Sequence, residues 1–482
     1  MTISARPHEL NFVDGRWVAA MGGTAGPDLN PARPADVIGR FAHSGEDDVE
    51  AAVAAADAAL PSWRGQGPVR RAERLRALEQ VIARRADDFA HAITREQGKL
   101  LREARAEVER SLSILRFTAG EGRRLGGATV PAEDARTFSY TLRVPLGVVG
   151  LITPWNFPLA IPVWKVAPAL LSGCTAVLKP SPLTPLVAAL LTEAVAEAGV
   201  PPGVLNLVQG DVAAGEALVR HPAVAGVSFT GSLAVGLLIQ AGAARRLART
   251  QLELGGKNAV LVLGDADLDA AADAVVQGAF GQAGQRCSAT SRVIVEVGVK
   301  DALLDRLVHR VNRLKVGPGT GRAVDVGPMI SAARRDACLG AVERARGTGA
   351  KVLCGGDTVP GDGYFMQPTV LSEVRESAEL AQEEIFGPVL SVIDADRFSD
   401  AVRIANGVRY GMSGTVFTRD PSRIFEAIEA LDVGMLHVNR PGVGAYAHLP
   451  HGGGKMSQYG PPECSPHVWE FYTQWRSACI AF

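Results

Sequence analysis

The pattern of apolar positions changes along the chain, and the change separates a helical region from a region of alternating strands and helices. Residues 47–60 and 69–97 place apolar residues at steps of three and four, which is typical of amphipathic helices against a core. Between residues 148 and 243, short β-branched runs are each followed by a helix-compatible segment: VVGLITP, TAVLKP, VLNLVQG and VAGVSFTG. This alternation predicts a mostly parallel sheet with ligands at the carboxyl ends of its strands.

A second α/β region is predicted from about residue 256 to residue 455. Its helical stretches include residues 267–280 and 299–315, and five apolar runs between such stretches have the composition of buried strands. These runs are NAVLVL, RVIVEV, PVLSVI, GTVFT and GMLHVN. The simplest interpretation is an α/β fold with two Rossmann-like lobes and a cleft between them.

Residues 137–144 and the tail 468–480 read as extended chain outside both lobes. The first segment alternates strictly and places four side chains on one face: Phe138, Tyr140, Leu142 and Val144. Such segments predict either strands that pair between subunits or an ordinary surface hairpin, and the pattern alone favours neither.

Composition narrows the class of protein. A chain of 482 residues holds about three domain-sized units, or two with a decorated edge. Fifty basic against 51 acidic residues leave a net charge of -1, so neither nucleic acid nor a membrane surface is an expected partner. Six scattered cysteines without a CxxC pair predict neither disulfides nor a metal site. The N-terminus has no signal-like apolar stretch, which favours a cytoplasmic protein.

Three residues are candidates for chemistry. Cys287 lies in a small-residue segment between a predicted helix and a predicted strand, where an accessible thiol would fit; the alternative is a small buried hydrophobe. Arg286 and nearby backbone N–H groups would lower the pKa of this thiol. Glu253 ends a predicted strand, and a carboxylate within such an apolar run is energetically unfavourable unless it has a function or a partner. The alternative is a salt-bridged structural residue. Asn156 lies in a loop stiffened by prolines, where its side-chain N–H could stabilise an oxyanion. The alternative is an Asn that only forms the turn.

Together, the segments TPWNFP, ELGGKN and GQRC resemble the aldehyde dehydrogenase superfamily. The resemblance covers nearly the whole chain, because NFVDGRW, LKPSPLTP, FTGS, EEIFGPV and PHGGGKMS occur in matching order. It implies two Rossmann-like lobes plus a small β oligomerisation arm in a homodimer or homotetramer. The implied boundaries are a dinucleotide-binding domain at 1–123 and 146–255, a catalytic domain at 256–455, and an arm at 124–145 and 456–482.

The resemblance also implies catalytic roles. Cys287 as a thiolate attacks the aldehyde, and the Asn156 side chain and the Cys287 N–H hold the oxyanion of the thiohemiacetal. Glu253 then activates the water that releases the carboxylic acid. Relatives that transfer the acyl group to coenzyme A usually lack this Glu, so hydrolysis is favoured. Lys165 corresponds to a lysine in a proton path.

For the cofactor, the resemblance implies NAD or NADP. Lys179 matches a ligand of the adenine ribose, and Gly231 and Ser232 open a helix whose amides can receive the pyrophosphate. Glu384 matches the carboxylate that grips the nicotinamide ribose, with Phe386 packed near it. The other residues implied at this site are Ile152, Thr153, Pro154, Trp155, Ser181, Pro182, Phe229, Thr230, Leu254 and Gly255.

Two departures from the family pattern change these expectations. Pro182 stands where many relatives carry a Glu that accepts from the ribose 2'-hydroxyl. Losing this carboxylate removes its repulsion toward a 2'-phosphate, and Ser181 could donate to that phosphate, so NADP is expected to be at least competitive. Near the C-terminus, Gln458 replaces a Gly and prolines replace the usual Arg-Glu, so Glu463 could take over the proton path after a one-residue shift.

Substrate identity stays open between two branches. The segments around Asn156 and Cys287 are similar to semialdehyde dehydrogenases, which implies a small aldehyde with a distal carboxylate and makes Arg286 and Arg292 available cations, although Arg292 is more often structural. The PHGGGKMSQYG ending is closer to aminoaldehyde and betaine aldehyde enzymes. Aromatic side chains for an amine-binding mouth would be Trp155, Trp164, Tyr446 and Tyr459. A catalytically silent oligomeric binding protein and a coenzyme A-acylating enzyme are further alternatives.

Overall fold

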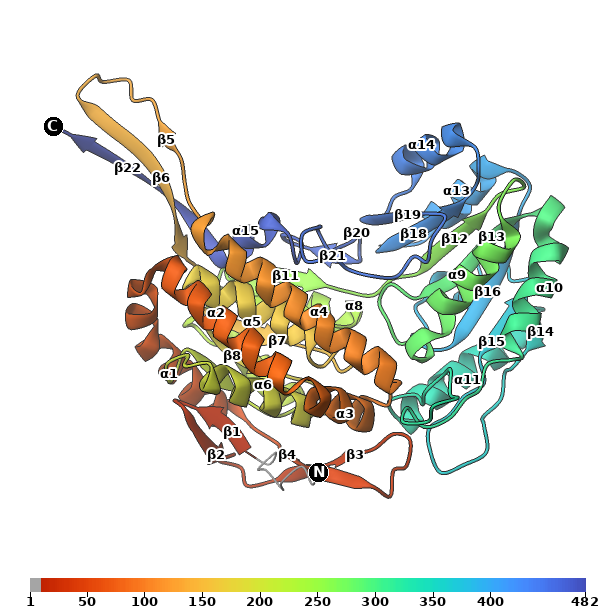
Figure 1. The fold of residues 1–482 in the computed structure, drawn as a ribbon, viewed down its shortest axis with the longest axis horizontal. Helices are drawn as coiled ribbons and strands as arrows, with labels where there is room; N and C mark the ends of the chain where they lie inside the picture. Colours follow the sequence, from red (N-terminus) through yellow and green to blue (C-terminus); the bar gives the residue numbers. More distant parts are fainter. Residues whose placement is uncertain (1–9) are drawn as a thin grey trace.

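The computed structural model describes residues 10–482, which form two α/β lobes and a projecting three-stranded arm (Figure 1). Residues 1–9, on which much of the interpretation of the N-terminus depends, lie outside this range. No helix within residues 10–482 is both long enough and apolar enough to cross a membrane.

The first lobe is built on an eight-stranded sheet in the order β2-β1-β9-β8-β7-β10-β11-β21. Its five inner strands are parallel and the β1 and β21 pairings are antiparallel. Buried on both faces, the inner strands read as continuous apolar runs rather than as alternating ones. The strands are β1 (Leu10–Val13), β2 (Arg16–Ala19), β7 (Val148–Ile152), β8 (Thr175–Lys179), β9 (Leu205–Leu207), β10 (Val224–Thr230), β11 (Arg249–Glu253) and β21 (Gln458–Tyr459).

Helices cover both faces of this sheet, and each layer has its own cluster of buried apolar side chains. One face carries α1 (Glu46–Gly65), α7 (Val212–Arg220) and α8 (Leu233–Ala244). The other carries α2 (Gly67–Arg84), α3 (Ala86–Gln97), α4 (Leu101–Gly120), α5 (Ala160–Ser172) and α6 (Pro185–Glu197). The apolar period over 69–97 therefore spans two helices that break at Arg85 and pack on the same core.

The order of the strands creates the place for a site. From β7 the chain proceeds to β8 and β9 on one side and returns to β10 and β11 on the other. The loops after β7 and β10 therefore leave the sheet in opposite directions and open a crevice at the carboxyl ends of these strands.

The second lobe has a seven-stranded sheet in the order β14-β15-β16-β13-β12-β18-β19, parallel except for the edge strand β14. The five predicted strands and both predicted helical stretches are confirmed, and β14 and β15 were not foreseen. The strands are β12 (Asn258–Val262), β13 (Thr290–Glu296), β14 (Lys351–Cys354), β15 (Thr369–Ser372), β16 (Val389–Ala395), β18 (Ser413–Phe417) and β19 (Met435–Val438). The helices are α9 (Leu268–Phe280), α10 (Lys300–Val311), α11 (Ala332–Gly347), α12 (Glu379–Gln382), α13 (Phe398–Asn406) and α14 (Pro421–Ala430).

The arm consists of β5 (Thr129–Val130), β6 (Thr137–Pro145) and β22 (Thr473–Ala481), with β22 paired antiparallel to β6 along its whole length. The prediction of extended chain from residue 468 is wrong for its first part. Residues 466–472 form two short helical turns, η4 (Pro466–Val468) and α15 (Trp469–Tyr472), because their aromatic side chains join the core of the first lobe. The projecting segment at the C-terminus is β22.

Short elements complete the fold. Two-stranded ribbons are β3 (Ala25–Leu29) with β4 (Val37–Ala42) and β17 (Tyr410–Gly411) with β20 (Gly454–Lys455). Single helical turns are η1 (Glu121–Arg123), η2 (Gly281–Gly284) and η3 (Val297–Val299).

Candidate active site between the lobes

The three candidate residues come from three loops or strand ends that face one another between the lobes. Asn156 follows β7, Glu253 is the last residue of β11, and Cys287 lies between η2 and β13. Each occupies the kind of position that the sequence predicted for it.

Cys287 borders two cavities, of about 560 and about 530 Å³. The first cavity is also lined by Glu253, Arg110 and Trp164, and the second by Asn156 and Glu384. Three further residues line both cavities: Ile161, Thr230 and Leu254. A thiol between two cavities can contact a different small molecule on each side.

The Cys287 side chain is half-buried. Burial raises the pKa of its thiol to about 12, and the negative charges of Glu384 and Glu253 act in the same direction. The backbone N–H groups of Cys287 and Ser288 oppose this rise and lower the pKa. In this state the thiol is therefore protonated at neutral pH.

Arg286 is not among the main influences on this pKa, although its charge and the Cys287 thiol do interact. Its guanidinium donates to the backbone carbonyl oxygens of Gly281 and Gln277, both at 3.2 Å. Arg292 is buried and donates to carbonyl oxygens of the second lobe, including Lys257 O at 2.7 Å. It is therefore a structural residue and is not available to a ligand.

Glu253 is buried, and neither carboxylate oxygen has a hydrogen-bond partner among residues 10–482. Burial raises the pKa of this carboxyl well above its usual value, the charge of Glu463 raises it further, and Lys165 opposes the rise. A carboxyl with a raised pKa and free oxygens facing a cavity is equipped to exchange a proton there. The salt-bridged alternative does not fit this geometry.

Lys165 and Glu463 form a buried ion pair behind Glu253. The ammonium also donates to Ser228 Oγ at 2.8 Å, and Ser228 donates to Gln251 Oε1 at 2.8 Å. The structure thus brings Glu463 against Lys165 despite the one-residue shift in the C-terminal motif, and both Glu463 and Glu253 line the first cavity.

The Asn156 carboxamide is buried and donates through Nδ2 to Gln285 O at 3.1 Å, two residues before the candidate thiol. Its N–H groups therefore face the loop that carries Cys287. An oxyanion formed at this thiol would be an alternative acceptor for the same donor.

The second cavity fits a dinucleotide. Ser232 caps the N-terminus of α8, and Gly231 to Ala234 line the cavity, so the first amides of this helix border it. The buried hydroxyl of Thr230, which lines the cavity, lacks a partner among the described residues. Gly255 lies against the Glu384 carboxylate, leaving no space for a Cβ.

Glu384 accepts from Gly256 N at 3.0 Å, and burial raises the pKa of its carboxyl to about 7. Trp155 and Phe386 pack edge to face at 5.4 Å in the wall of the same cavity. Six predicted cofactor residues lie on or directly after strand ends β7, β8 and β10 without lining this cavity: Ile152, Thr153, Lys179, Ser181, Pro182 and Phe229. Lys179 donates to Pro180 O and Gly210 O, and burial lowers the pKa of its ammonium to about 8.

The predicted aromatic mouth is incomplete. Trp164 lines the first cavity, but Trp155 belongs to the second. Tyr446 is 42% exposed and accepts from Arg440 at 2.7 Å, and Tyr459 is 55% exposed on the edge strand β21. These side chains do not surround a common volume.

Three residues around the site were missed: Lys99, just before α4, and Glu107 and Arg110 along it. Lys99 and Glu107 form a fully buried ion pair with N–O distance 2.6 Å. The guanidinium of Arg110 lines the first cavity over the Phe157 ring and has no hydrogen bond or ion pair among residues 10–482. The available signal was the spacing of Glu103, Glu107 and Arg110, charged residues at i, i+4 and i+7 beside apolar positions of one helix.

Comparison with known proteins gives the family. The aldehyde dehydrogenase family model matches residues 17–478. The chain belongs to the aldehyde dehydrogenase family. It is an NAD(P)-dependent aldehyde dehydrogenase of the α/β fold described above. It is 41% identical to an α-ketoglutaric semialdehyde dehydrogenase of Bacillus subtilis (strain 168), over 98% of each chain.

Solved structures agree with this assignment. An Escherichia coli NADP-dependent enzyme superimposes with a TM-score of 0.95 at 36% identity, covering 98% of each chain. A betaine aldehyde dehydrogenase of Staphylococcus aureus in complex with NAD⁺ gives a TM-score of 0.96 at 32% identity, covering 98% of this chain and 95% of that one.

Proposed function

We propose that this aldehyde dehydrogenase oxidises a small aldehyde with a distal carboxylate to the acid. The main observation behind this proposal is the position of Cys287 between two cavities. One cavity is lined by Glu253 and an unpaired Arg110, and the other by Asn156 and Glu384. The semialdehyde named for the Bacillus subtilis relative supports the same class of substrate.

In the proposed reaction, the Cys287 thiolate attacks the aldehyde carbon, and Asn156 Nδ2 and the Cys287 N–H stabilise the oxyanion. NAD(P), when bound, supplies the hydride acceptor. Glu253 then takes a proton from the water that attacks the thioester, and its raised pKa suits this role. We assign Lys165 and Glu463 to the path along which that proton leaves.

We further propose that the lobe of residues 1–123 and 146–255 binds the dinucleotide, that residues 256–455 form the catalytic domain, and that the arm is for oligomerisation. Several of the predicted cofactor residues, in the loops after β7 and β10, line the second cavity, and this supports the proposed dinucleotide-binding lobe. NADP is expected to be at least competitive with NAD, since Pro182 leaves no carboxylate facing a 2'-phosphate.

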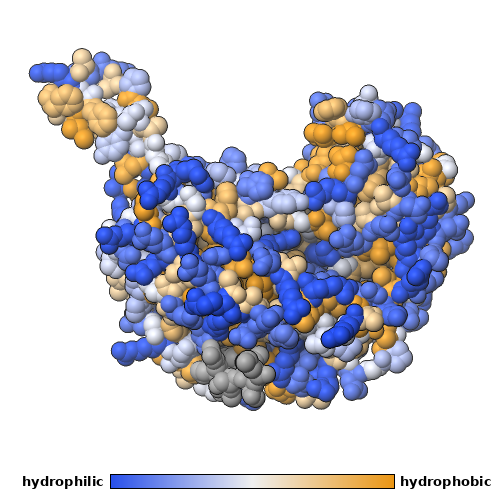
Figure 2. All heavy atoms as spheres, viewed as in Figure 1, coloured by the Kyte–Doolittle hydropathy of each residue, from blue (hydrophilic) through white to orange (hydrophobic). Residues whose placement is uncertain are grey.

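The assembly proposed is a homodimer or homotetramer. The arm stands clear of both lobes, and Figure 2 shows apolar side chains at its tip. Its exposed large apolar residues are Val130, Phe138, Trp475, Ile480 and Phe482. An edge strand with such side chains is typical of a surface covered by another chain.

The substrate is tested with carboxylate-bearing, amine-bearing and aliphatic aldehydes of similar length, assayed with both cofactors. A half-buried cation without a counter-ion is unfavourable, so a substrate carboxylate that pairs with Arg110 contributes a charge-assisted bond. We expect Arg110→Met to lower kcat/KM for carboxylate-bearing aldehydes by roughly 10- to 100-fold and to spare aliphatic ones.

The matched control is Arg102→Met at the rim, where the side chain already pairs with Asp325 at 3.7 Å. It should change kcat/KM little for every aldehyde. Preference for an amine-bearing aldehyde would favour the betaine-type alternative. A burst of NAD(P)H that persists in Cys287→Ala would contradict the proposed chemistry, and a need for coenzyme A would indicate acyl transfer instead of hydrolysis.

A further inference from the structure

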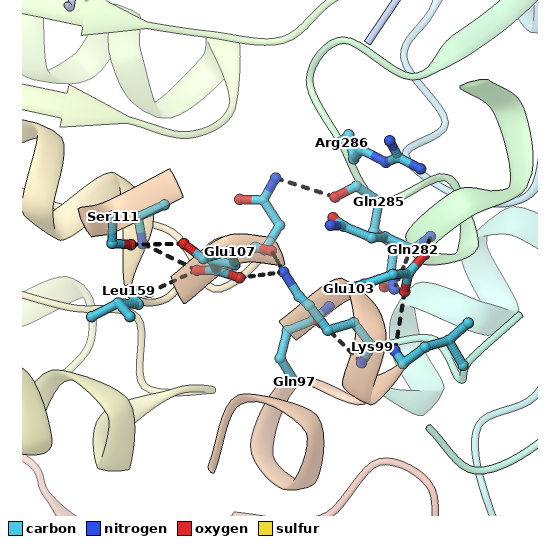
Figure 3. Close-up of polar contacts among 12 residues, drawn as sticks. Gln97, Lys99, Glu103, Glu107, Ser111, Leu159, Gln282, Gln285 and Arg286 are labelled. Carbon is cyan, nitrogen blue, oxygen red and sulfur yellow. Dashed lines mark hydrogen bonds and ion pairs between the residues drawn. The ribbon is translucent and has the colours of Figure 1, made fainter. Parts of the chain in front are cut away.

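Helix α4 and the residues just before it contact both loops that carry the proposed catalytic side chains. Lys99 lies two residues before α4, and Glu103 and Glu107 are one turn apart on the helix. Figure 3 shows the three side chains gathered between the Leu159 segment and the Gln282 segment.

Lys99 and Glu107 hydrogen-bond to the Asn156 loop at two different places. Lys99 Nζ donates to Glu107 Oε2 at 2.6 Å and to the backbone oxygen of Asn156 at 2.8 Å. Glu107 Oε1 accepts from Leu159 N at 2.9 Å and from Ala160 N at 3.1 Å. The ammonium therefore holds the carbonyl of Asn156, while the carboxylate holds the start of α5.

The same helix reaches the cysteine loop. Glu103 Oε1 accepts from Gln282 N at 2.8 Å, where Gln282 and Ala283 have left-handed φ values of 54° and 53°. Three residues after Gln282, the carbonyl of Gln285 accepts from the Asn156 carboxamide. One helix thus sets the relative position of a loop from each lobe.

Stability of the fold alone does not explain the buried charges of Lys99 and Glu107. A buried ion pair is often no more stabilising than apolar residues of the same volume. Apolar residues at 99 and 107 would fill the space, but they would leave the Asn156 carbonyl and the Leu159 and Ala160 amides without these partners. The pair therefore acts on the orientation of the peptide that carries the Asn156 side chain.

We propose that Lys99 and Glu107 are positioning residues for the Asn156 carboxamide, fixing the oxyanion-stabilising N–H relative to Cys287. This inference rests on the proposed role of Asn156. Displacing a catalytic group by about 1 Å can lower a rate about 100-fold, so a loosened loop has a measurable effect.

Lys99→Met tests the proposal in single-turnover measurements of NAD(P)H formation. We expect kcat to fall roughly 10- to 100-fold. The KM for the cofactor and the rate of Cys287 alkylation should stay within about twofold, because neither depends on the Asn156 donor. A folded Lys99→Met enzyme with wild-type kcat overturns the proposal.

A double-mutant cycle separates positioning from general damage. In an Asn156→Ala background, Lys99→Met should lower kcat by less than about twofold, because the group it positions is gone. An equal loss in both backgrounds overturns the proposal. If Asn156→Ala itself retains wild-type kcat, the proposed oxyanion role fails, whereas an inactive Asn156→Ala beside an active Lys99→Met leaves that role intact and removes only the positioning.

Two more variants guard against misfolding. If Lys99→Met does not fold, Glu107→Gln replaces it as the test, because Gln keeps an acceptor oxygen. The same fall in kcat is expected for this variant. Arg71→Met is the matched control, because Arg71 is also buried and donates to carbonyl oxygens, at 2.8 Å to Leu171 O and 3.1 Å to Arg64 O. It should lower the melting temperature without lowering kcat, and an equal loss of kcat would overturn the proposal.

Discussion

Burial and two neighbouring carboxylates together set the protonation of the Cys287 thiol. Burial is the largest cause of its raised pKa, and Glu384 and Glu253 add negative charge that disfavours the thiolate. Removing one of these charges therefore lowers the pKa of Cys287 and increases the thiolate fraction at a given pH. The Glu384 carboxyl itself titrates near neutrality, with a pKa of about 7.

We expect Glu384→Gln to speed alkylation of Cys287 by iodoacetamide roughly three- to tenfold at a fixed alkaline pH, since the thiolate is the reacting form. In the wild-type enzyme the rate should rise about tenfold per pH unit up to the thiol pKa of about 12. Glu383→Gln is the control, because the adjacent Glu383 pairs with Arg409 and does not line either cavity. A slower reaction in Glu384→Gln would contradict this electrostatic account.

Among the elements, the turn between β8 and α6 is where we expect the choice between NAD and NADP to be made. Lys179 ends β8, and the turn that follows is held by Leu183 N donating to Ser181 Oγ at 3.2 Å. Pro182 is half-buried at this turn, so a longer side chain there has room to extend from it. A carboxylate in this place would attract the 2'-hydroxyl of NAD and repel the 2'-phosphate of NADP.

Pro182→Glu should therefore lower kcat/KM with NADP about tenfold or more and improve the value with NAD. Steady-state kinetics with both cofactors check this, and Leu183→Glu, at a side chain that is 38% exposed, is the control for added charge. A strong NAD preference in the wild-type enzyme would refute the expected use of NADP.

At the scale of the whole molecule, the exposed apolar side chains of the arm have no explanation within a single chain. Its sheet order β22-β6-β5 leaves β22 as an outer strand, and its apolar side chains contact neither lobe's core cluster. Figure 2 also shows apolar side chains over the second lobe near α14, where Phe425 is 69% exposed. Burying such surfaces between copies of the chain is the proposed source of assembly.

Charges placed on the arm should disrupt that assembly. Phe138 and Ile480 are cross-strand partners in the β6–β22 register, and we expect the double variant Phe138→Asp with Ile480→Asp to lower the molar mass measured by light scattering. Val37→Asp on β4, where the side chain is 54% exposed against 45% for Phe138 and 49% for Ile480, is the control. An unchanged mass in the double variant would contradict a role of the arm in oligomerisation.

Local pattern determined most of the framework of this protein. The strand runs from VVGLITP to GMLHVN and the positions of Asn156, Glu253 and Cys287 at strand ends or in loops follow from periodicity and flanking residues, which are local in sequence. Pattern could not separate α2 from α3, because both helices present the same period to one core. It also assigned residues 468–472 to an extended tail, since three aromatic residues within a short stretch suit a strand or a buried turn equally.

Only the tertiary structure decided the directions and partners of charged side chains. Arg286 is next to Cys287 in sequence yet points to backbone carbonyls, whereas Lys99 and Glu107, far away along the chain, hold the Asn156 loop. Arg110 became a candidate for substrate recognition when the fold placed it on the cavity of Cys287. Electrostatic effects depend on distance and burial in space, and a linear pattern contains neither quantity.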